Sequence, residues 1–307
     1  MNPTTGILLK LASTLVFTAM VACIKVLAAT VPVGEIVFSR SFFALIPILV
    51  FVVWRGRLAD AVRTAHIGGH VWRCVVGVSS MACSFAALAY LPLPEQMAIG
   101  YAAPLITVVL AALLLGETVR LYRTSAVIVG FLGILVILWP RLEVLRHGLA
   151  GSDDVLGAGL ALAGAVFSAM AMVAVRRLVA TENTQAIVFY LSLISSLLAL
   201  LSLPLGWVWP TPLEAALLVL SGILGGLGQI LLTESYRHAD TSTIAPFEYT
   251  TMIWGLALGY LLFAEVPSLA VLAGAAIVIA SGIFIILREH YLGIERARAR
   301  RVATPQG

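Results

Sequence analysis

Charged side chains are scarce in this sequence: only 11% of its 307 residues are Asp, Glu, Lys or Arg, whereas 61% are hydrophobic. A soluble domain carries roughly 25% charged residues, so most of the surface of this protein cannot face water. The sequence also lacks the Gly-x-x-x-x-Gly-Lys loop that cradles nucleotide phosphates in many ATPases. These absences argue against a soluble catalytic domain and against internal ATP hydrolysis.

Residues that build metal and redox sites are equally sparse. The three cysteines, Cys23, Cys74 and Cys83, all fall in apolar stretches, where we expect them to pack as small apolar side chains. The five histidines are scattered over loops and helix ends without metal-ligand spacing, and the acidic pair Asp153-Asp154 falls in a loop. We therefore expect no catalytic residue, no metal and no cofactor. An intramembrane enzyme stays a distant alternative, as does a channel or a structural scaffold.

Long apolar stretches occupy most of the chain. A helix needs about 20 apolar residues to cross a bilayer, and about ten such stretches follow one another here. The sequence thus predicts an all-α integral membrane protein with ten transmembrane helices. The predicted spans are residues 6–28, 34–54, 69–89, 94–115, 122–140, 155–175, 184–206, 212–235, 242–263 and 267–287.

The distribution of Lys and Arg between the loops predicts the orientation. Cytoplasmic loops carry an excess of positive charge, and alternate loops here are rich in Arg, as is the segment after Arg288. Both termini are therefore expected in the cytoplasm, with the lipid bilayer rather than nucleic acid as the partner of the basic tail. The arginines that carry this argument are Arg55, Arg57, Arg63, Arg120, Arg123, Arg176, Arg177 and Arg237.

An internal repeat with a period of roughly 145–150 residues divides the sequence. Residues 16–20 (Val-Phe-Thr-Ala-Met) recur as residues 166–170 (Val-Phe-Ser-Ala-Met), and Tyr101 matches Tyr249. We expect a first repeat at 1–148, a second at 149–290 and a basic tail at 291–307. Each repeat has five predicted spans, so the second enters the membrane inverted. Two inverted five-helix repeats are typical of secondary transporters that alternate between the two sides of the membrane.

Several short motifs lie at corresponding places of the spans. They are the span ends Leu115-Gly116-Glu117 and Phe263-Ala264-Glu265, the start of the second span from Gly34 to Arg40, and Gly100-Tyr101-Ala102-Ala103-Pro104-Leu105 in the fourth. Together with the ten spans and the repeat, these motifs resemble the drug/metabolite transporter superfamily, specifically its EamA-domain branch. The resemblance covers nearly the whole chain. It implies metabolite import or export without ATP in a bacterial inner membrane. It also implies a central cavity lined by the first, third, fourth, sixth, eighth and ninth spans.

Within that branch, the chain looks closer to riboflavin-uptake and S-adenosylmethionine carriers than to amino-acid exporters, and export of a metabolite or amino acid is the alternative. The expected partner is a small-molecule metabolite. The sequence leaves the substrate, the direction of transport, the coupling ion and homodimer formation open.

The ninth span holds the leading candidate for a substrate or coupling site. Pro246 removes a backbone hydrogen bond just before Glu248 and Tyr249, and a broken helix beside a carboxylate is typical of a midplane transport site. Tyr101, the repeat partner of Tyr249, is expected to line the same cavity and offers a flat face to an aromatic substrate. Glu248 serves equally well in an interhelical ion pair, and both readings stay open.

Other polar residues within the spans are candidates because polar groups are costly in a membrane interior. Lys25 is expected to extend towards the interface, and the repeat pair Glu117 and Glu265 to form contacts at helix ends. The expected substrate-binding set is Tyr101, Tyr249, Glu248, Gln229, Trp254 and Gln96, and the expected coupling or gating set is Glu248, Glu95, Arg40 and Lys25.

Overall fold

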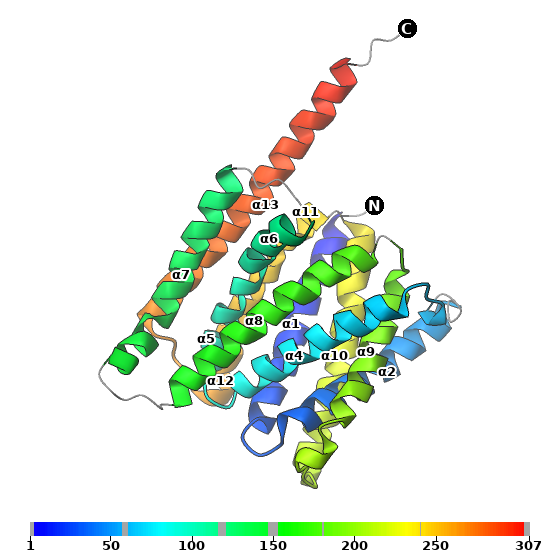
Figure 1. The fold of residues 1–307 in the computed structure, drawn as a ribbon, viewed down its shortest axis with the longest axis vertical. Helices are drawn as coiled ribbons and strands as arrows, with labels where there is room; N and C mark the ends of the chain where they lie inside the picture. The colour runs from blue at the N-terminus through cyan, green and yellow to red at the C-terminus, as the bar shows by residue number, and fades with distance from the viewer. Residues whose placement is uncertain are drawn as a thin grey trace.

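Helices make up almost all of the structure. The computed structural model describes residues 3–56, 61–115, 121–146, 153–179, 181–239 and 241–303, which form a bundle of long, roughly aligned helices joined by short connections (Figure 1). The helices are α1 Pro3–Leu27, α2 Val33–Trp54, α4 Ile67–Ala87, α5 Leu93–Gly100, α6 Ala102–Leu115, α7 Leu121–Arg146, α8 Asp153–Leu178, α9 Thr184–Leu200, α10 Pro212–His238, α11 Thr241–Ile244, α12 Thr250–Phe263 and α13 Leu269–Ala303, with short 3₁₀ turns η1 Leu203–Leu205 and η2 Ala245–Tyr249.

Helical segments occur at each of the predicted spans. Within the described ranges, seven stretches are long and apolar enough to cross a bilayer, and they correspond to α1, α2, α5 with α6, α7, α8, α10 and α13. The protein is therefore a multi-pass membrane protein. The other predicted spans give weaker signals for visible reasons: α4 carries Arg73, α9 is short, and the ninth segment is interrupted by η2.

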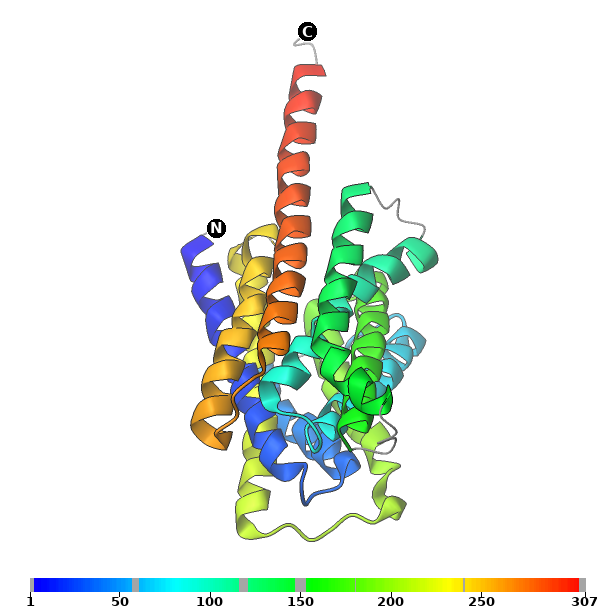
Figure 2. The ribbon, with the colours of Figure 1, turned by 90° about the vertical axis from the view of Figure 1, so that its left-hand side faces the viewer.

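One predicted span end is wrong. The seventh span ends at Leu200 rather than at residue 206, because Pro204 cannot continue a helix and Gly206 turns the chain at φ 95°, a conformation that glycine adopts without steric cost. The predicted end of the tenth span at residue 287 is confirmed, since the apolar stretch runs from Leu269 to Arg288. Its helix α13 continues beyond the span to Ala303 and projects from the bundle (Figure 2).

The fourth and ninth segments are both broken. In the fourth, α5 ends at Gly100, Tyr101 forms the cap, and α6 begins at Ala102; Pro104 leaves the Gly100 carbonyl without its usual helical donor. In the ninth, α11 passes into the 3₁₀ turn η2 around Pro246 before α12 starts at Thr250. The predicted interruption at Pro246 is thus confirmed.

Helix pairing crosses the boundary between the halves. The main packing partners are α1 with α10, α4 with α8, α7 with α13, and α2 with α9 and α10. Glycines bring α2 and α10 together: a Cβ at Gly222 would lie 2.9 Å from the Ser39 carbonyl oxygen, and one at Gly226 would lie 2.6 Å from that of Ala44. Small residues allow such close helix contacts inside a membrane.

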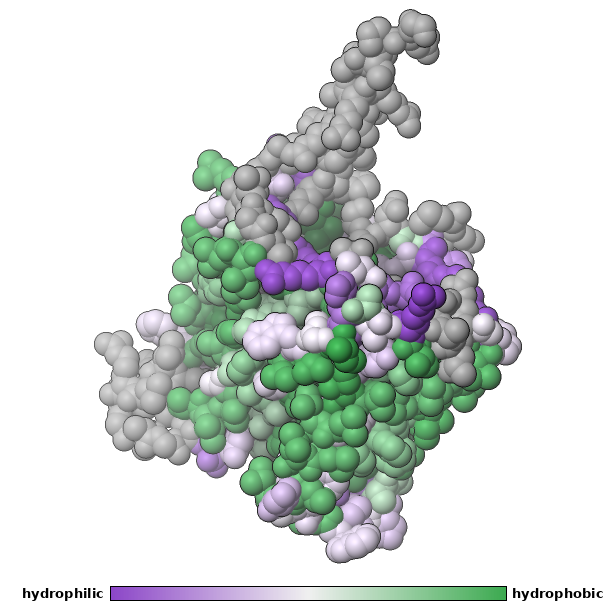
Figure 3. All heavy atoms as spheres, turned by 45° about the vertical axis from the view of Figure 1, so that its right-hand side comes forward, coloured by the Kyte–Doolittle hydropathy of each residue, from purple (hydrophilic) through white to green (hydrophobic). Residues whose placement is uncertain are grey.

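The outer surface of the bundle is largely apolar. Figure 3 shows hydrophobic side chains over most of the visible body, with hydrophilic ones gathered near one end. Exposed Val50, Leu113, Leu135 and Leu261 belong to helices on different sides of the bundle, as expected of side chains in contact with lipid. The N-terminal start of α1 and the projecting end of α13 lie at the same end of the bundle (Figures 1 and 2).

Candidate functional site

The two broken helices meet at a pair of tyrosines. The ring centroids of Tyr101 and Tyr249 lie 5.3 Å apart with an interplanar angle of 64°, an edge-to-face arrangement. The Tyr101 hydroxyl lies 2.6 Å from Thr251 Oγ1 and donates to the Tyr249 carbonyl oxygen at 3.4 Å. The two tyrosines that the repeat aligns in sequence therefore come together in space, each at the interruption of its helix.

An ion pair stands beside this contact. Lys10 on α1 pairs with Glu248 of η2; the Lys10 side chain is 3% exposed and the Glu248 side chain 53% exposed. One turn along α1, Thr14 Oγ1 lies 3.0 Å from Thr250 Oγ1 and accepts a hydrogen bond from Trp254 Nε1 at 3.2 Å. These residues form a continuous polar and aromatic group, called the tyrosine cluster below: Lys10, Thr14, Tyr101, Glu248, Tyr249 and Trp254.

The position of Tyr249 depends on a glycine of α13. A Cβ at Gly282 would overlap the Tyr249 hydroxyl, and the Gly282 position is buried. The ring of Tyr249 therefore fits between Tyr101 on one side and the bare backbone of α13 on the other. This contact connects the last long helix to the break in the ninth segment.

Lys25 binds to two chain connections at one end of the bundle. Its ammonium lies 2.8 Å from Glu265 Oε1 and donates to the Leu91 carbonyl oxygen at 2.7 Å, while the Leu93 amide donates to Glu265 Oε2 at 2.8 Å. The Lys25 side chain is only 13% exposed. The expectation that Lys25 extends to the interface is therefore wrong, because a carboxylate and a carbonyl satisfy its charge inside the protein.

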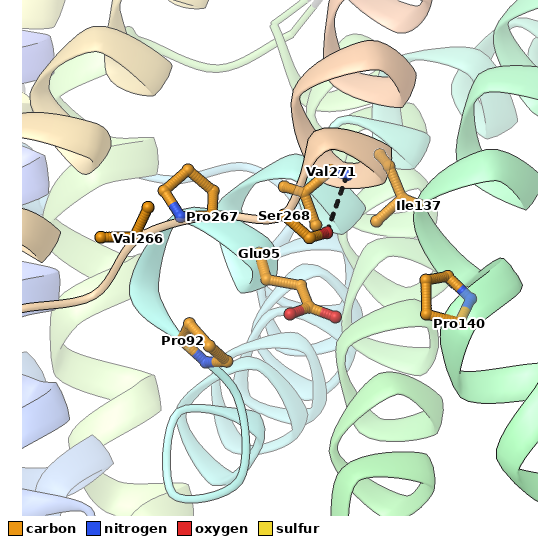
Figure 4. A pocket seen from close by; sticks show the side chains of 8 residues that line it. All are labelled: Pro92, Glu95, Ile137, Pro140, Val266, Pro267, Ser268 and Val271. Atoms are coloured by element: carbon orange, nitrogen blue, oxygen red, sulfur yellow. Dashed lines mark hydrogen bonds between the residues drawn. The ribbon is translucent and has the colours of Figure 1, made fainter.

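Glu95 lines a cavity of about 300 Å³ near this end. Figure 4 shows its carboxylate between the start of α5, the end of α7 and the connection into α13. Gln96, the next residue, is half-buried and is not part of this lining. The lining consists of Pro92, Glu95, Ile137, Pro140, Val266, Pro267, Ser268 and Val271.

Ion pairs also connect helices at the opposite end. Glu234 on α10 accepts from Arg55 at 3.0 Å and from Arg237 at 2.9 Å. Glu182, between α8 and α9, accepts from the Ala65 amide at 2.8 Å, the Thr64 hydroxyl at 3.0 Å and the His66 amide at 2.9 Å. Burial opposes ionisation of Glu182, but these hydrogen bonds outweigh it and hold the pKa of the carboxyl below its ordinary value.

Like Lys25, Glu95 and Gln96, the predicted site residues Gln229 and Arg40 lie apart from the tyrosine cluster. Gln229 lines a small cavity of about 30 Å³ between α2, α9 and α10. Arg40 on α2 packs beside Gly225 of α10. Glu117 lies outside the described residues. In the part of the chain that the structure describes, no group of three or more His, Cys, Asp or Glu side chains is placed to hold a metal ion.

Two residues of the tyrosine cluster, Lys10 and Thr14, were not predicted from the sequence. Both lie on the same face of α1 near its start. The sequence signal for Lys10 is a cation within an apolar stretch, and Arg73 in α4 is another such cation. Such a cation also suits a side chain that extends to the interface, so sequence alone does not identify its partner.

A family comparison finds the same kind of protein in both halves of the chain. The model described as "EamA-like transporter family" matches residues 4–139 and again residues 155–288. A second model, described as "Solute carrier family 35", matches residues 92–205.

Curated relatives share most of the chain length. The pseudopaline exporter of Pseudomonas aeruginosa is 31% identical over 278 residues, which cover 89% of this chain and 93% of that protein. The S-adenosylmethionine uptake transporter of Rickettsia prowazekii is 29% identical over 258 residues, which cover 83% of each chain. These relatives are named as transporters and not as enzymes, and their names indicate opposite directions of transport.

A solved structure supports the fold. A chain titled only "Crystal structure of protein" superposes with a TM-score of 0.65 over 94% of this chain and 99% of its own, at 20% sequence identity. At that identity the likeness concerns the arrangement of helices and carries no information on the substrate.

Proposed function

The chain belongs to the EamA-like transporter family, and from this we propose that it is a secondary transporter that carries a small organic metabolite across a bacterial inner membrane by alternating access. The observation that carries the proposal is the meeting of two interrupted helices at Tyr101 and Tyr249. Interrupted segments at corresponding positions of two repeats are the best structural pointer to a transporter's binding site.

The twofold organisation of the packing supports alternating access. The family model matches the chain twice. The sequence repeat relates α1 to α8 and α4 to α10, so it converts the α1–α10 contact into the α8–α4 contact, and both are among the main helix contacts. We propose that the halves at 1–148 and 149–290 are inverted five-helix repeats, ten spans in all. Such halves can rock against each other around a site between them.

Ion pairs at both ends of the bundle fit a gating role. Lys25 and Glu265 connect α1 to the connection after α12, and Glu234 connects α10 to Arg55 after α2. Each contact joins elements from different halves. Opening the cavity to one side requires these elements to separate, so we propose that the Lys25–Glu265 pair is broken in the state open to that end. Glu95, in the neighbouring cavity, is proposed to line the same entrance.

The Lys10–Glu248 pair is our candidate for proton coupling. Glu248 is half-exposed beside the tyrosine cluster, while Lys10 is buried. Protonation of Glu248 would break the pair and leave the ammonium without a countercharge, which changes the energy of the helix contact between α1 and η2. The carboxylate therefore connects proton binding to the helix break.

The tyrosine cluster favours a substrate with a flat aromatic ring. It brings together three aromatic rings, Tyr101, Tyr249 and Trp254, with Thr14 and Glu248 as polar partners. A nucleoside-like or isoalloxazine-like metabolite satisfies both, so S-adenosylmethionine and riboflavin are the first substrates to test. Metabolite or amino-acid export by the same architecture is the alternative, because the curated relatives include both an exporter and an importer.

The test is uptake into proteoliposomes that contain the purified protein. Radiolabelled S-adenosylmethionine and riboflavin are offered with and without a pH gradient, to the native protein and to Tyr249→Ala, Glu248→Gln and Tyr260→Ala. Tyr260 is the matched control, because it is exposed on the outer face of α12. We expect saturable uptake that Tyr249→Ala reduces by about two- to tenfold, given roughly 0.5–1.5 kcal/mol for a lost ring contact, and that Tyr260→Ala leaves unchanged.

The proposed role of Glu248 in proton coupling is tested separately, by the effect of the pH gradient on uptake. If the pH gradient raises uptake in the native protein and not in Glu248→Gln, the assignment of Glu248 stands. Gradient-driven uptake that survives in Glu248→Gln removes the coupling role and leaves the carrier in place. Absence of flux for both compounds and for metabolites extracted from the host cell would contradict the transport proposal.

A further inference from the structure

Within the described part of the chain, two arginines lie inside the bundle without a countercharge. Arg40 on α2 and Arg73 on α4 each have a buried Nε that finds no hydrogen-bond partner among these residues. Among the residues that the structure describes, neither side chain forms an ion pair with a carboxylate; Glu35, one turn before Arg40, accepts a hydrogen bond from the Val208 amide at 3.2 Å instead. A charged group in a membrane-spanning helix is costly and usually has a functional partner.

Both guanidinium groups lie in the middle of the bundle. Arg40 Nε would be 3.3 Å from a Cβ at Gly225, the central residue of α10, and Arg73 Nη1 would be 2.5 Å from a Cβ at Gly77, the central residue of α4. Arg73 therefore extends one turn towards the C-terminal end of its own helix, against the usual direction of helical side chains. In each case a glycine leaves the space that the guanidinium occupies.

The two arginines lie on neighbouring helices. Helices α2 and α4 pack together in the bundle, so two positive charges sit on adjoining helices of the same half. Repulsion between buried like charges is expensive in a low-dielectric interior. Both guanidinium groups lie in the middle of the bundle, each in space that a glycine leaves, and an anion that entered there would neutralise them.

We infer that Arg40 and Arg73 bind a carboxylate or phosphate group of the transported metabolite. Of the two compounds named above, S-adenosylmethionine carries such a group and riboflavin does not, so the inference favours the former. The inference rests on the transport function proposed above. Guanidinium groups bind carboxylates and phosphates through paired, charge-assisted hydrogen bonds. Each arginine comes from a different helix of the first half, so one bound anion connects α2 to α4 and offsets their repulsion.

Binding can be tested without knowledge of the natural substrate. The thermal stability of the purified protein is followed at constant ionic strength while citrate or inorganic phosphate is titrated, for the native chain and for Arg40→Gln, Arg73→Gln and Arg63→Gln. Arg63 is the matched control, because it is exposed in the loop before α4. We expect either anion to stabilise the native protein and Arg63→Gln with equal affinity, and each midplane variant to lose about 10–100-fold in affinity.

Stability without anion separates this role from a structural one. Loss of one of two repelling charges should leave the apo melting temperature of Arg40→Gln and Arg73→Gln unchanged or raised. A lowered melting temperature together with unchanged anion affinity would overturn the inference.

A second pair of variants keeps both charges. Gly77→Ala pushes the Arg73 guanidinium from its position, whereas Gly68→Ala on the same helix adds a methyl into open space. We expect anion affinity to fall in Gly77→Ala and not in Gly68→Ala; equal affinities would contradict the placement of the site.

The transport assay keeps this inference distinct from the proposed function. Flux with an unchanged Michaelis constant in Arg40→Gln and Arg73→Gln would overturn the anion site and leave the carrier intact. Anion binding that both variants abolish, in a protein without flux for any metabolite, would leave the anion site intact and overturn the carrier.

Discussion

At the residue scale, the Lys10–Glu248 pair is unequal in burial. Lys10 is nearly inaccessible, whereas about half of the Glu248 side chain is exposed. An ammonium that loses its countercharge in the interior has no alternative partner, but an exposed carboxylate can bind water. Removal of Glu248 should therefore lower the free energy of unfolding more than removal of Lys10.

We expect Glu248→Gln to destabilise the protein much more than Lys10→Met. The first variant leaves a buried ammonium unpaired, which costs about 3–5 kcal/mol, while the second leaves an exposed carboxylate, which costs about 1 kcal/mol or less. The double variant should resemble Lys10→Met alone. Denaturant titration of the purified protein measures the three free energies of unfolding; equal losses in the two single variants would contradict the assigned asymmetry.

Glu182 predicts a pH dependence outside the membrane-spanning helices. Its pKa in the folded protein lies below the ordinary value of 4.5, so the ionised carboxylate stabilises the fold above about pH 4.5, and this contribution disappears as the pH falls through the lowered pKa. We expect Glu182→Gln to melt lower than the native protein at neutral pH and to converge with it in acid. Thermal melts from about pH 7 to about pH 3 measure this across the range where the carboxyl titrates, with the exposed Asp153→Asn as the control that should follow the native curve throughout.

Pattern alone recovers only part of the residue-level site. The repeat and Pro246 point to Tyr101, Tyr249 and Glu248, and the folded chain brings the two tyrosines into contact. Lys10 escapes prediction because a helix that is apolar almost all round gives no amphipathic pattern to show which face is inward. Glu265, the partner of Lys25, escapes prediction because it is distant from Lys25 in sequence.

At the scale of single elements, proline and glycine determine where helices break and how closely they approach. Pro246 predicts the interruption of the ninth segment, which is broken there. The fourth segment is broken at Tyr101, just before Pro104, and that break was not predicted. The end of α9 at Leu200 was not predicted, because an apolar run through Leu205 continues past the helix. Hydropathy reports what is buried in lipid, whereas backbone geometry at Pro204 and Gly206 decides where the helix stops.

Gly282 offers a test of the contact between α13 and the break in the ninth segment. Gly282→Ala places a methyl where the Tyr249 hydroxyl lies, and overpacking of this kind costs about 1–3 kcal/mol. We expect the variant to be destabilised and Gly282→Ala with Tyr249→Phe to recover part of the loss, because the colliding hydroxyl is gone. The unfolding free energies of both proteins decide this: a double variant no more stable than Gly282→Ala would show that the hydroxyl is not the obstacle.

At the scale of the whole molecule, the arrangement of spans predicts which loops face each side. In a background without Cys23, Cys74 and Cys83, a thiol at Trp209→Cys should react with a membrane-impermeant maleimide from the periplasmic side. A thiol at Arg63→Cys should react only after the inner membrane is opened. Both native side chains are exposed, so burial does not limit labelling. The reverse pattern would invert the proposed orientation, with both termini then outside.

The two midplane arginines also place the protein in the electric field of the membrane. Movement of one elementary charge across the whole bilayer is worth about 2.3 kcal/mol per 100 mV. In the proposed alternating-access cycle, the empty carrier would take both guanidinium charges through part of that field at each turnover. A bound dianion cancels them, so the loaded step is insensitive to voltage. An interior-negative potential therefore draws the empty site towards the cytoplasm. Voltage alone drives export of such an anion, and uptake requires a second gradient to oppose it.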